Sequence, residues 1–155
     1  MALDTYTNLK AEIALWLNRQ DLTAQIPTFI TLLEAQAERS LHVRQMETRS
    51  YATLDEQFLE LPEDFHALKT VQLNSDPVTP LDFVPMRELD EIRRQNAGVA
   101  GRPVAYSLVG DELEFAPVPD TAYEVEIVYL AKIPRLATGT QETNWLLEKH
   151  PDVYL

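Results

Sequence analysis

The chain has 155 residues, of which 45 % are hydrophobic and 25 % are charged, and this composition argues against a disordered protein. The length suits one domain, over residues 1–155, that can bury a hydrophobic core. With 25 acidic and 13 basic residues the net charge is −12, which disfavours direct binding to nucleic acid because the chain repels phosphate backbones.

Two amphipathic helices are predicted over residues 1–43, and we expect them to pack as a helical hairpin. Apolar residues three or four positions apart predict the first helix, which Thr5 or Thr7 can cap. These apolar residues are Leu9, Ile13, Trp16 and Leu17. The apolar stripe of the second helix comprises Ile26, Phe29, Ile30, Leu33, Ala37 and Leu41. Its solvent face comprises Glu34, Gln36, Glu38 and Arg39.

A β-rich part is predicted over residues 44–136, where the apolar period changes to two. We expect one inserted helix near residues 85–97, followed by two strands that meet in a tight turn at Gly110-Asp111. The other strands are expected at 44–54, 57–61, 67–74, 79–84 and 122–130. A C-terminal helix then starts within residues 143–155, with Thr143 or Asn144 as its cap. The order of elements predicts an α+β fold with a small, mainly antiparallel sheet.

Four glutamates are the strongest acidic feature of the predicted strands. Glu112 and Glu114 share one face of their strand, and Glu124 and Glu126 share one face of theirs, because side chains alternate along a strand. We expect all four to form the polar face of a half-buried antiparallel sheet. The alternative is a hydrolytic metal site or an acid/base pair on this face. The sequence lacks the aspartate-rich loop typical of calcium sites, and it indicates no apolar pocket around these carboxylates.

Other chemistry finds little support in the sequence. The three histidines, His42, His66 and His150, are not spaced as metal ligands. There are no cysteines and only four glycines, so a thiolate nucleophile and a glycine-rich phosphate loop are excluded. No apolar run is long enough to cross a membrane. We therefore expect no catalytic activity, no cofactor, no metal and no membrane association.

The C-terminal segment carries an aromatic and aliphatic cluster. Clusters of this composition are enriched at protein interfaces, but they also complete hydrophobic cores. Both interpretations stay open from the sequence. The candidate partner-contact residues are Trp145, Leu146, Val153, Tyr154 and Leu155.

An ordered set of motifs resembles a known protein family. They are "YTNLKAEIALWLNRQDLTAQIPTFITLLEAQAERSLHVRQM", "LELPEDFHALKTVQL", "GRPVAYSLVGDELEFAPVP", "EIVYLAKIPRL" and "NWLLEKHPDVYL". In this order they are similar to the small head-to-tail adaptor proteins of tailed bacteriophages. The resemblance covers nearly the whole chain and rests on the order of the motifs.

The resemblance implies a structural protein of the virion, without catalysis. It implies a homo-oligomeric ring of twelve subunits beneath the portal protein, joining it to a tail protein. The ring would be assembled in the cytoplasm of the bacterial host and lie at the head–tail junction, where DNA passes during packaging and ejection without specific binding. The four glutamates are then candidates for a channel-facing surface. Family members continue with further helix after "HPDVYL", so we expect the terminal helix to be incomplete here.

Two other functions remain open at this point. The chain could be a protein-interaction adaptor or chaperone in the bacterial cytoplasm, unrelated to a virion. It could also be a metal-dependent hydrolase that uses the acidic strands. The genomic neighbourhood distinguishes the first from a phage protein, and stoichiometric metal binding that depends on Glu112 would support the second.

Overall fold

A computed structural model describes residues 3–19 and 21–155, and the fold is α+β, as the sequence predicts. The chain forms two compact units. One comprises Met1–Met46 with Lys132–Leu155 and is called the helical unit below. The other comprises Glu47–Ala131 and is called the sandwich unit.

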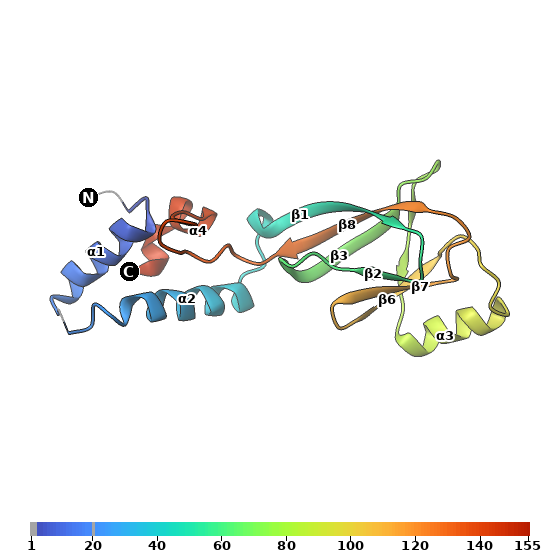
Figure 1. The fold of residues 1–155 in the computed structure, drawn as a ribbon, viewed down its shortest axis with the longest axis horizontal. Helices are drawn as coiled ribbons and strands as arrows, with labels where there is room; N and C mark the ends of the chain where they lie inside the picture. The colour runs from blue at the N-terminus through green and yellow to red at the C-terminus, as the bar shows by residue number, and fades with distance from the viewer. Residues whose placement is uncertain (1–2, 20) are drawn as a thin grey trace. The chain divides into compact units, whose positions relative to one another are not determined.

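The helical unit contains the N-terminal helix pair and the C-terminal segment (Figure 1). Thr5 caps the first helix by accepting a hydrogen bond from the Asn8 amide at 3.2 Å, and Asn18 ends it in a left-handed conformation with φ 48°. Asn144 caps the C-terminal helix in the same way as Thr5 caps the first helix. The α-helices are α1 (Tyr6–Leu17), α2 (Ile26–Ser40) and α4 (Trp145–Lys149). The 3₁₀ turns are η1 (Arg44–Met46) and η2 (Pro151–Tyr154).

The C-terminal segment is a short helix and a separate turn rather than one helix over residues 143–155. His150 adopts φ −140° and ψ 58°, which is not helical. Proline disfavours the helical conformation of the residue before it and has no amide hydrogen to donate, so Pro151 explains the break. A proline then suits the first position of η2.

The buried faces of α1 and α2 differ from the predicted stripes. In α1 only Tyr6 and Leu9 are buried, whereas Trp16 is 74 % exposed. In α2 the predicted solvent face is wrong at two positions, because Glu34 and Glu38 are 1 % and 8 % exposed. Part of the expected apolar stripe lies at the surface instead, with Phe29 half exposed.

The sandwich unit contains two four-stranded sheets. The strand order is β1-β8-β3-β4 in the first sheet and β2-β7-β6-β5 in the second, and every pairing is antiparallel except that of β5 with β6. The first-sheet strands are β1 (Glu47–Leu54), β3 (Phe65–Leu73), β4 (Thr79–Pro80) and β8 (Tyr123–Ala131). The second-sheet strands are β2 (Phe58–Glu60), β5 (Asp82–Phe83), β6 (Ala105–Val109) and β7 (Glu112–Ala116).

Two strand predictions differ from the structure. The strand expected over residues 79–84 is divided at buried Leu81, so that β4 belongs to the first sheet and β5 to the second. The strand expected from residue 44 begins at Glu47, after the turn η1. The first difference is a division inside the predicted strand, and the second lies at an element boundary, where local sequence preference is weakest.

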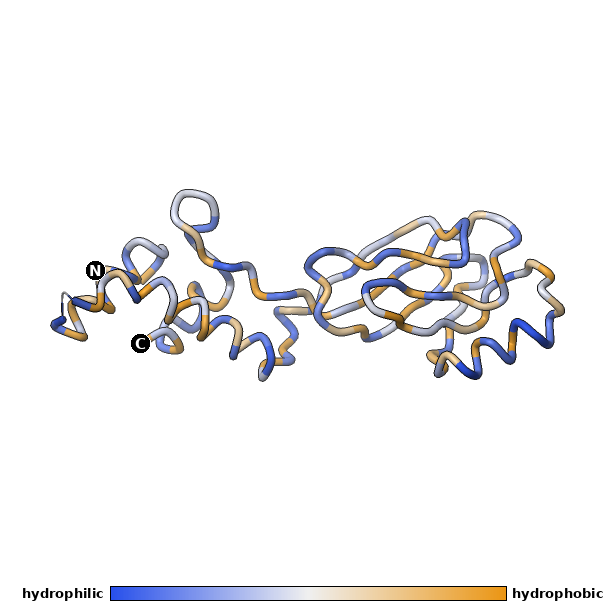
Figure 2. The backbone as a smooth tube through the Cα atoms, turned by 60° about the horizontal axis from the view of Figure 1, so that its bottom comes forward, coloured by the Kyte–Doolittle hydropathy of each residue, from blue (hydrophilic) through white to orange (hydrophobic). Residues whose placement is uncertain are grey.

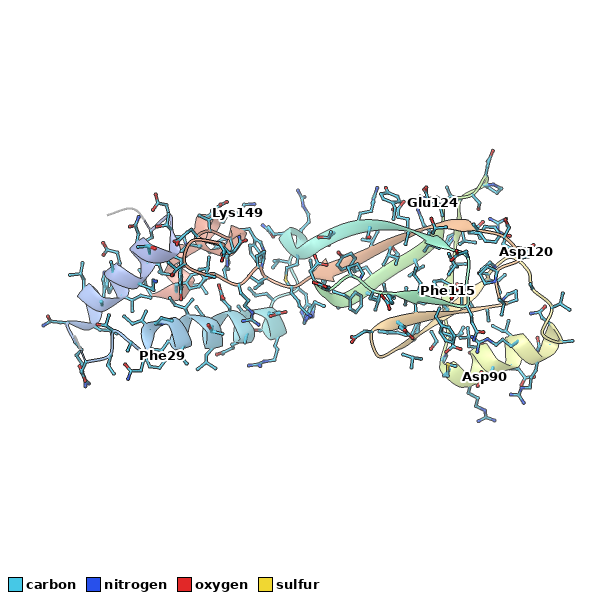
Figure 3. The ribbon with its side chains drawn as sticks, in the orientation of Figure 1. Phe29, Asp90, Phe115, Asp120, Glu124 and Lys149 are labelled. Atoms are coloured by element: carbon cyan, nitrogen blue, oxygen red, sulfur yellow. The ribbon has the colours of Figure 1, made fainter. Side chains whose placement is uncertain are left out.

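One hydrophobic core fills the space between the two sheets. Alternation places Val125, Ile127 and Tyr129 of β8 inward, opposite Leu113 and Phe115 of β7. Figure 3 labels Phe115, which is fully buried. The core therefore depends on the period-two pattern that the sequence shows.

Helix α3 (Met86–Gln95) covers the outer face of the second sheet, beside β6 and β7 (Figure 1). Along this helix, short runs of hydrophilic residues separate single hydrophobic residues, as the colours of Figure 2 show. Buried Leu89 packs on Ala105 and Ala116, whose small side chains let the helix approach the strands. This sheet is thus covered on both faces, which matters for Glu114 of β7.

Phe115→Ala should lower the free energy of unfolding by about 3–5 kcal/mol, because it leaves a cavity between the two sheets. The matched control is Phe58→Ala, since Phe58 is 50 % exposed and should cost under about 1 kcal/mol. Urea unfolding followed by far-ultraviolet circular dichroism measures both. Equal losses for the two variants would contradict the placement of the core.

Candidate functional site

The four predicted glutamates do not form one surface. Glu112 and Glu114 belong to β7 in the second sheet, and Glu124 and Glu126 belong to β8 in the first. On each strand the intervening residues face the shared core, so each pair projects from the outer face of its own sheet. Glu124 lies on the outside of the first sheet (Figure 3). The prediction of a single polar face is therefore wrong.

Glu114 is also not exposed, contrary to the sequence prediction. It is 6 % exposed because α3 lies over it. The Arg93 guanidinium of α3 donates to the Glu114 carboxylate, with Nη2 and Oε1 2.6 Å apart, and also to the Phe115 carbonyl at 3.2 Å. The Gln57 amide donates to the same Glu114 oxygen at 2.9 Å. This carboxylate fastens α3 to the sheet.

Glu126 is buried as well, at 8 % exposure, by the long side chains of neighbouring strands. Arg49 of β1 pairs with it at 3.0 Å, and Gln72 of β3 donates to it at 3.2 Å. These partners come from the two strands that flank β8, so the contact is a cross-strand ladder. Of the four glutamates, Glu112 and Glu124 remain exposed.

The C-terminal cluster divides between core and surface. Leu146 and Tyr154 are buried in the helical unit, and Trp145 is half-buried. Val153 and Leu155 are 40 % and 49 % exposed. The structure thus brings part of the predicted contact set into the interior and leaves the remainder at the surface.

A buried carboxylate, Glu34 of α2, lies at the centre of the helical unit. The Tyr154 hydroxyl and the Asn144 side-chain amide each donate to Glu34 Oε1 at 3.1 Å. The Leu136 backbone amide donates to the same oxygen at 3.3 Å. Asn144 also caps α4 through a hydrogen bond from the Leu147 amide at 2.8 Å. One carboxylate therefore joins α2 to three positions between residues 136 and 154.

Burial raises the pKa of Glu34 above its usual range, although the hydrogen bonds from Tyr154, Leu136 and Asn144 and the charge of Arg135 oppose this shift. Burial likewise raises the pKa of Tyr154, and the nearby Glu34 carboxylate adds to that shift. Sequence reasoning missed Glu34 as a core residue. The sequence signal for its burial is its spacing, because Glu34 follows the buried positions Ile26 and Ile30 at intervals of four residues.

Two further carboxylates fasten the segment that precedes α4. Arg135 pairs with Glu38 at 2.8 Å and donates to the Thr31 carbonyl at 3.1 Å, both on α2. Glu142 accepts from the Thr7 amide of α1 at 3.1 Å and from the Gly139 amide at 2.7 Å. These backbone donors, with Gly139 first, lower the pKa of the Glu142 carboxyl. The buried and half-buried acids of this unit act as hydrogen-bond acceptors.

The buried carboxylates of both units join separate segments of the chain. Among residues 3–19 and 21–155, no three His, Cys, Asp or Glu side chains are placed to hold a metal ion. Within the same described residues, none of the helices combines the length and apolar character needed to cross a membrane. The carboxylates of Glu34, Glu114 and Glu126 accept hydrogen bonds or ion pairs from other segments.

Replacing Glu34 with glutamine should remove a pH-dependent contribution to the stability of the helical unit. Because the folded-state pKa of Glu34 is raised, its contribution is fully present below the unfolded pKa, about 4.3, and is lost as pH rises through the folded value. Trp16 and Trp145 are the two tryptophans and both belong to this unit. Tryptophan fluorescence during urea unfolding at pH 4 to 8 therefore reports this unit, and Gln36→Glu, at an exposed site, is the control.

Wild type and Glu34→Gln should differ in how the free energy of unfolding changes with pH. Wild type should lose stability relative to Glu34→Gln as pH rises above about 4.3. A constant difference across this range would contradict a raised pKa for Glu34.

Arg93→Met should destabilise the sandwich unit by about 3–5 kcal/mol, because it leaves the Glu114 carboxylate buried without its ion-pair partner. The double variant Arg93→Met with Glu114→Gln should recover much of the loss. Arg94→Met is the matched control, since the Arg94 side chain is 69 % exposed and its loss should cost under about 0.5 kcal/mol. Circular dichroism during urea unfolding distinguishes these outcomes, and equal losses for Arg93 and Arg94 would refute the burial of Glu114.

Comparison with known proteins gives one family. The model of the family described as SU10 adaptor protein matches residues 4–155. No curated protein matches the chain. The family match spans both structural units and agrees with the resemblance to phage head-to-tail adaptors that the motifs show. The chain therefore belongs to the SU10 adaptor protein family and is a bacteriophage adaptor protein.

Proposed function

We propose that this protein joins the phage head to the tail as a ring of twelve subunits beneath the portal. The observation that carries the proposal is the family match over residues 4–155. In this role it binds the portal protein on one side and a tail protein on the other. Its work is structural and needs no catalytic group, metal or cofactor.

Exposed apolar side chains in the helical unit support a role in protein contacts. Val153 and Leu155 lie at the surface, in the segment that also contains half-buried Trp145 and buried Leu146 and Tyr154. Large apolar side chains at a surface are typical of interaction sites when they gather in one region. We assign the portal contact to Trp145, Val153 and Leu155.

The charge of the chain suits a position around passing DNA. A net charge of −12 repels phosphate, so DNA could move through a ring of such subunits without being retained. Because Glu114 and Glu126 are engaged within the fold, the candidates that remain are Glu112 and Glu124, and since they lie on the outer faces of different sheets, one of the two would face the channel. On this proposal the protein is assembled in the bacterial cytoplasm and then remains in the virion at the head–tail junction.

The test mixes the protein with the portal ring of the same phage and images the mixture by electron microscopy. An added layer at one end of the portal is expected, and its rotational symmetry gives the copy number. The double variant Val153→Asp with Leu155→Asp should prevent the layer, while Val99→Asp, at a 67 % exposed site, should not. Tryptophan fluorescence checks that the helical unit of each variant is folded. Bare portals at saturating wild-type protein would contradict the proposed function.

A further inference from the structure

One side of the sandwich unit has two incomplete strand edges. β3 pairs with β8 from Phe65 to Leu73, but its other edge pairs with β4 only at Gln72 and Leu73. β6 pairs with β5 only at Ala105 and Tyr106. In the part of the chain that the structure describes, residues 65–70 of β3 and 107–109 of β6 thus have a strand neighbour on one side only. This side is called the open edge below.

A groove of about 440 Å³ lies between these two strand edges. Phe83 and Leu108 in its wall are 61 % and 38 % exposed, although Leu108 and its neighbour Tyr106 face the space between the sheets. The sandwich core is therefore partly uncovered along the open edge. The apolar lining includes Phe65, Ala67, Leu68, Phe83, Tyr106 and Leu108.

The opposite side of the sandwich unit is formed by β1 and β2, which end the two sheets there. β1 is eight residues long and pairs only with β8 among the described strands. Tyr51 and Phe58 on this side are 55 % and 50 % exposed. β1, β2 and the segment between them contain four acids, Glu47, Asp55, Glu56 and Glu60, and one base, Arg49. This side is called the acidic edge below.

We propose that the acidic edge of one copy docks on the open edge of the next, with β1 adding to β3 so that the first sheet continues from subunit to subunit. This inference rests on the proposed ring and identifies the surfaces that close it. β1 and β3 both run antiparallel to β8, so copies placed side by side bring β1 parallel to the neighbouring β3. Strand addition of this kind uses main-chain hydrogen bonds that an edge leaves unmade.

Charge favours a second copy as the occupant of the open edge. β3 carries Lys69 and His66 and no acid over its nine residues, whereas the acidic edge carries four acids and one base, Arg49. Lys69 pairs with Glu47 of its own chain, but its side chain stays 45 % exposed and can also meet a neighbour. The two surfaces differ, as a head-to-tail interface requires.

Because the chain contains no cysteine, introduced cysteines are the only thiols that a cross-linker can join. Thr53 of β1 and Thr70 of β3 are exposed and lie on the outer face of the first sheet, opposite Glu124 and Val128. One preparation carries Thr53→Cys and another Thr70→Cys. A flexible bis-maleimide that spans about four strand residues, or about 13 Å, tolerates differences in register. Both the free protein at high concentration and the portal-bound layer are treated.

A cross-linked dimer should form when the two preparations are mixed, with at least tenfold lower yield from either alone. Mixing Thr53→Cys with Val99→Cys is the matched control and should give only the low yield. Adding Leu108→Asp to the Thr70→Cys chain should abolish the mixed dimer, while adding Val99→Asp should not. Circular dichroism checks that each variant is folded.

The outcomes separate this inference from the proposed function. A portal-bound layer without the mixed dimer overturns the inference and leaves the adaptor function in place. A mixed dimer of the free protein with bare portals supports the inference and contradicts portal binding. Dimers from one single-cysteine preparation alone, or no mixed dimer in either sample, also overturn it.

Discussion

The helical unit depends on the burial of one carboxylate, that of Glu34. Helix α4 has five residues and η2 has four, and helices this short are not stable by themselves. Their ends are fixed because Asn144 and Tyr154 donate to Glu34, while Leu136 does so from the preceding segment. Burying a carboxylate is costly unless donors surround it, and these three donors offset part of that cost in the packing that the structure shows. The carboxylate therefore selects how the C-terminal segment packs.

The sandwich unit uses the same device on a different element. Helix α3 buries one residue fully, Leu89, so apolar contacts alone give it a weak attachment to the second sheet. The ion pair of Arg93 with Glu114 supplies a directional contact, because a guanidinium must align with its acceptors. Gln57 shares the same carboxylate and brings the residue before β2 to it. Apolar packing between the sheets provides the stability, and this polar contact specifies where the helix lies.

The elements that could be predicted from the sequence are those that local periodicity determines. The alternation in β8 identifies Val125, Ile127 and Tyr129 as core residues because period two follows from strand geometry alone. The assignment of β7 and β8 to different sheets could not be predicted, since strand order depends on contacts between distant residues. The burial of Glu114 could not be predicted for the same reason, because its covering residue Arg93 is 21 positions away. The burial of Glu34 could not be predicted either, because its donors lie beyond position 130.

The excess of acid also affects which strand edges can meet. An unpaired edge is a hazard, because it can pair with any other unpaired edge, including its own copy in a second molecule. Two acidic edges placed together would join two surfaces that each carry four acids and one base, and this repulsion disfavours a symmetric dimer. The open edge, with Lys69 and His66, carries no such penalty against the acidic edge. The charge pattern thus opposes closed pairs and permits head-to-tail contact, which is the contact that extends to a ring.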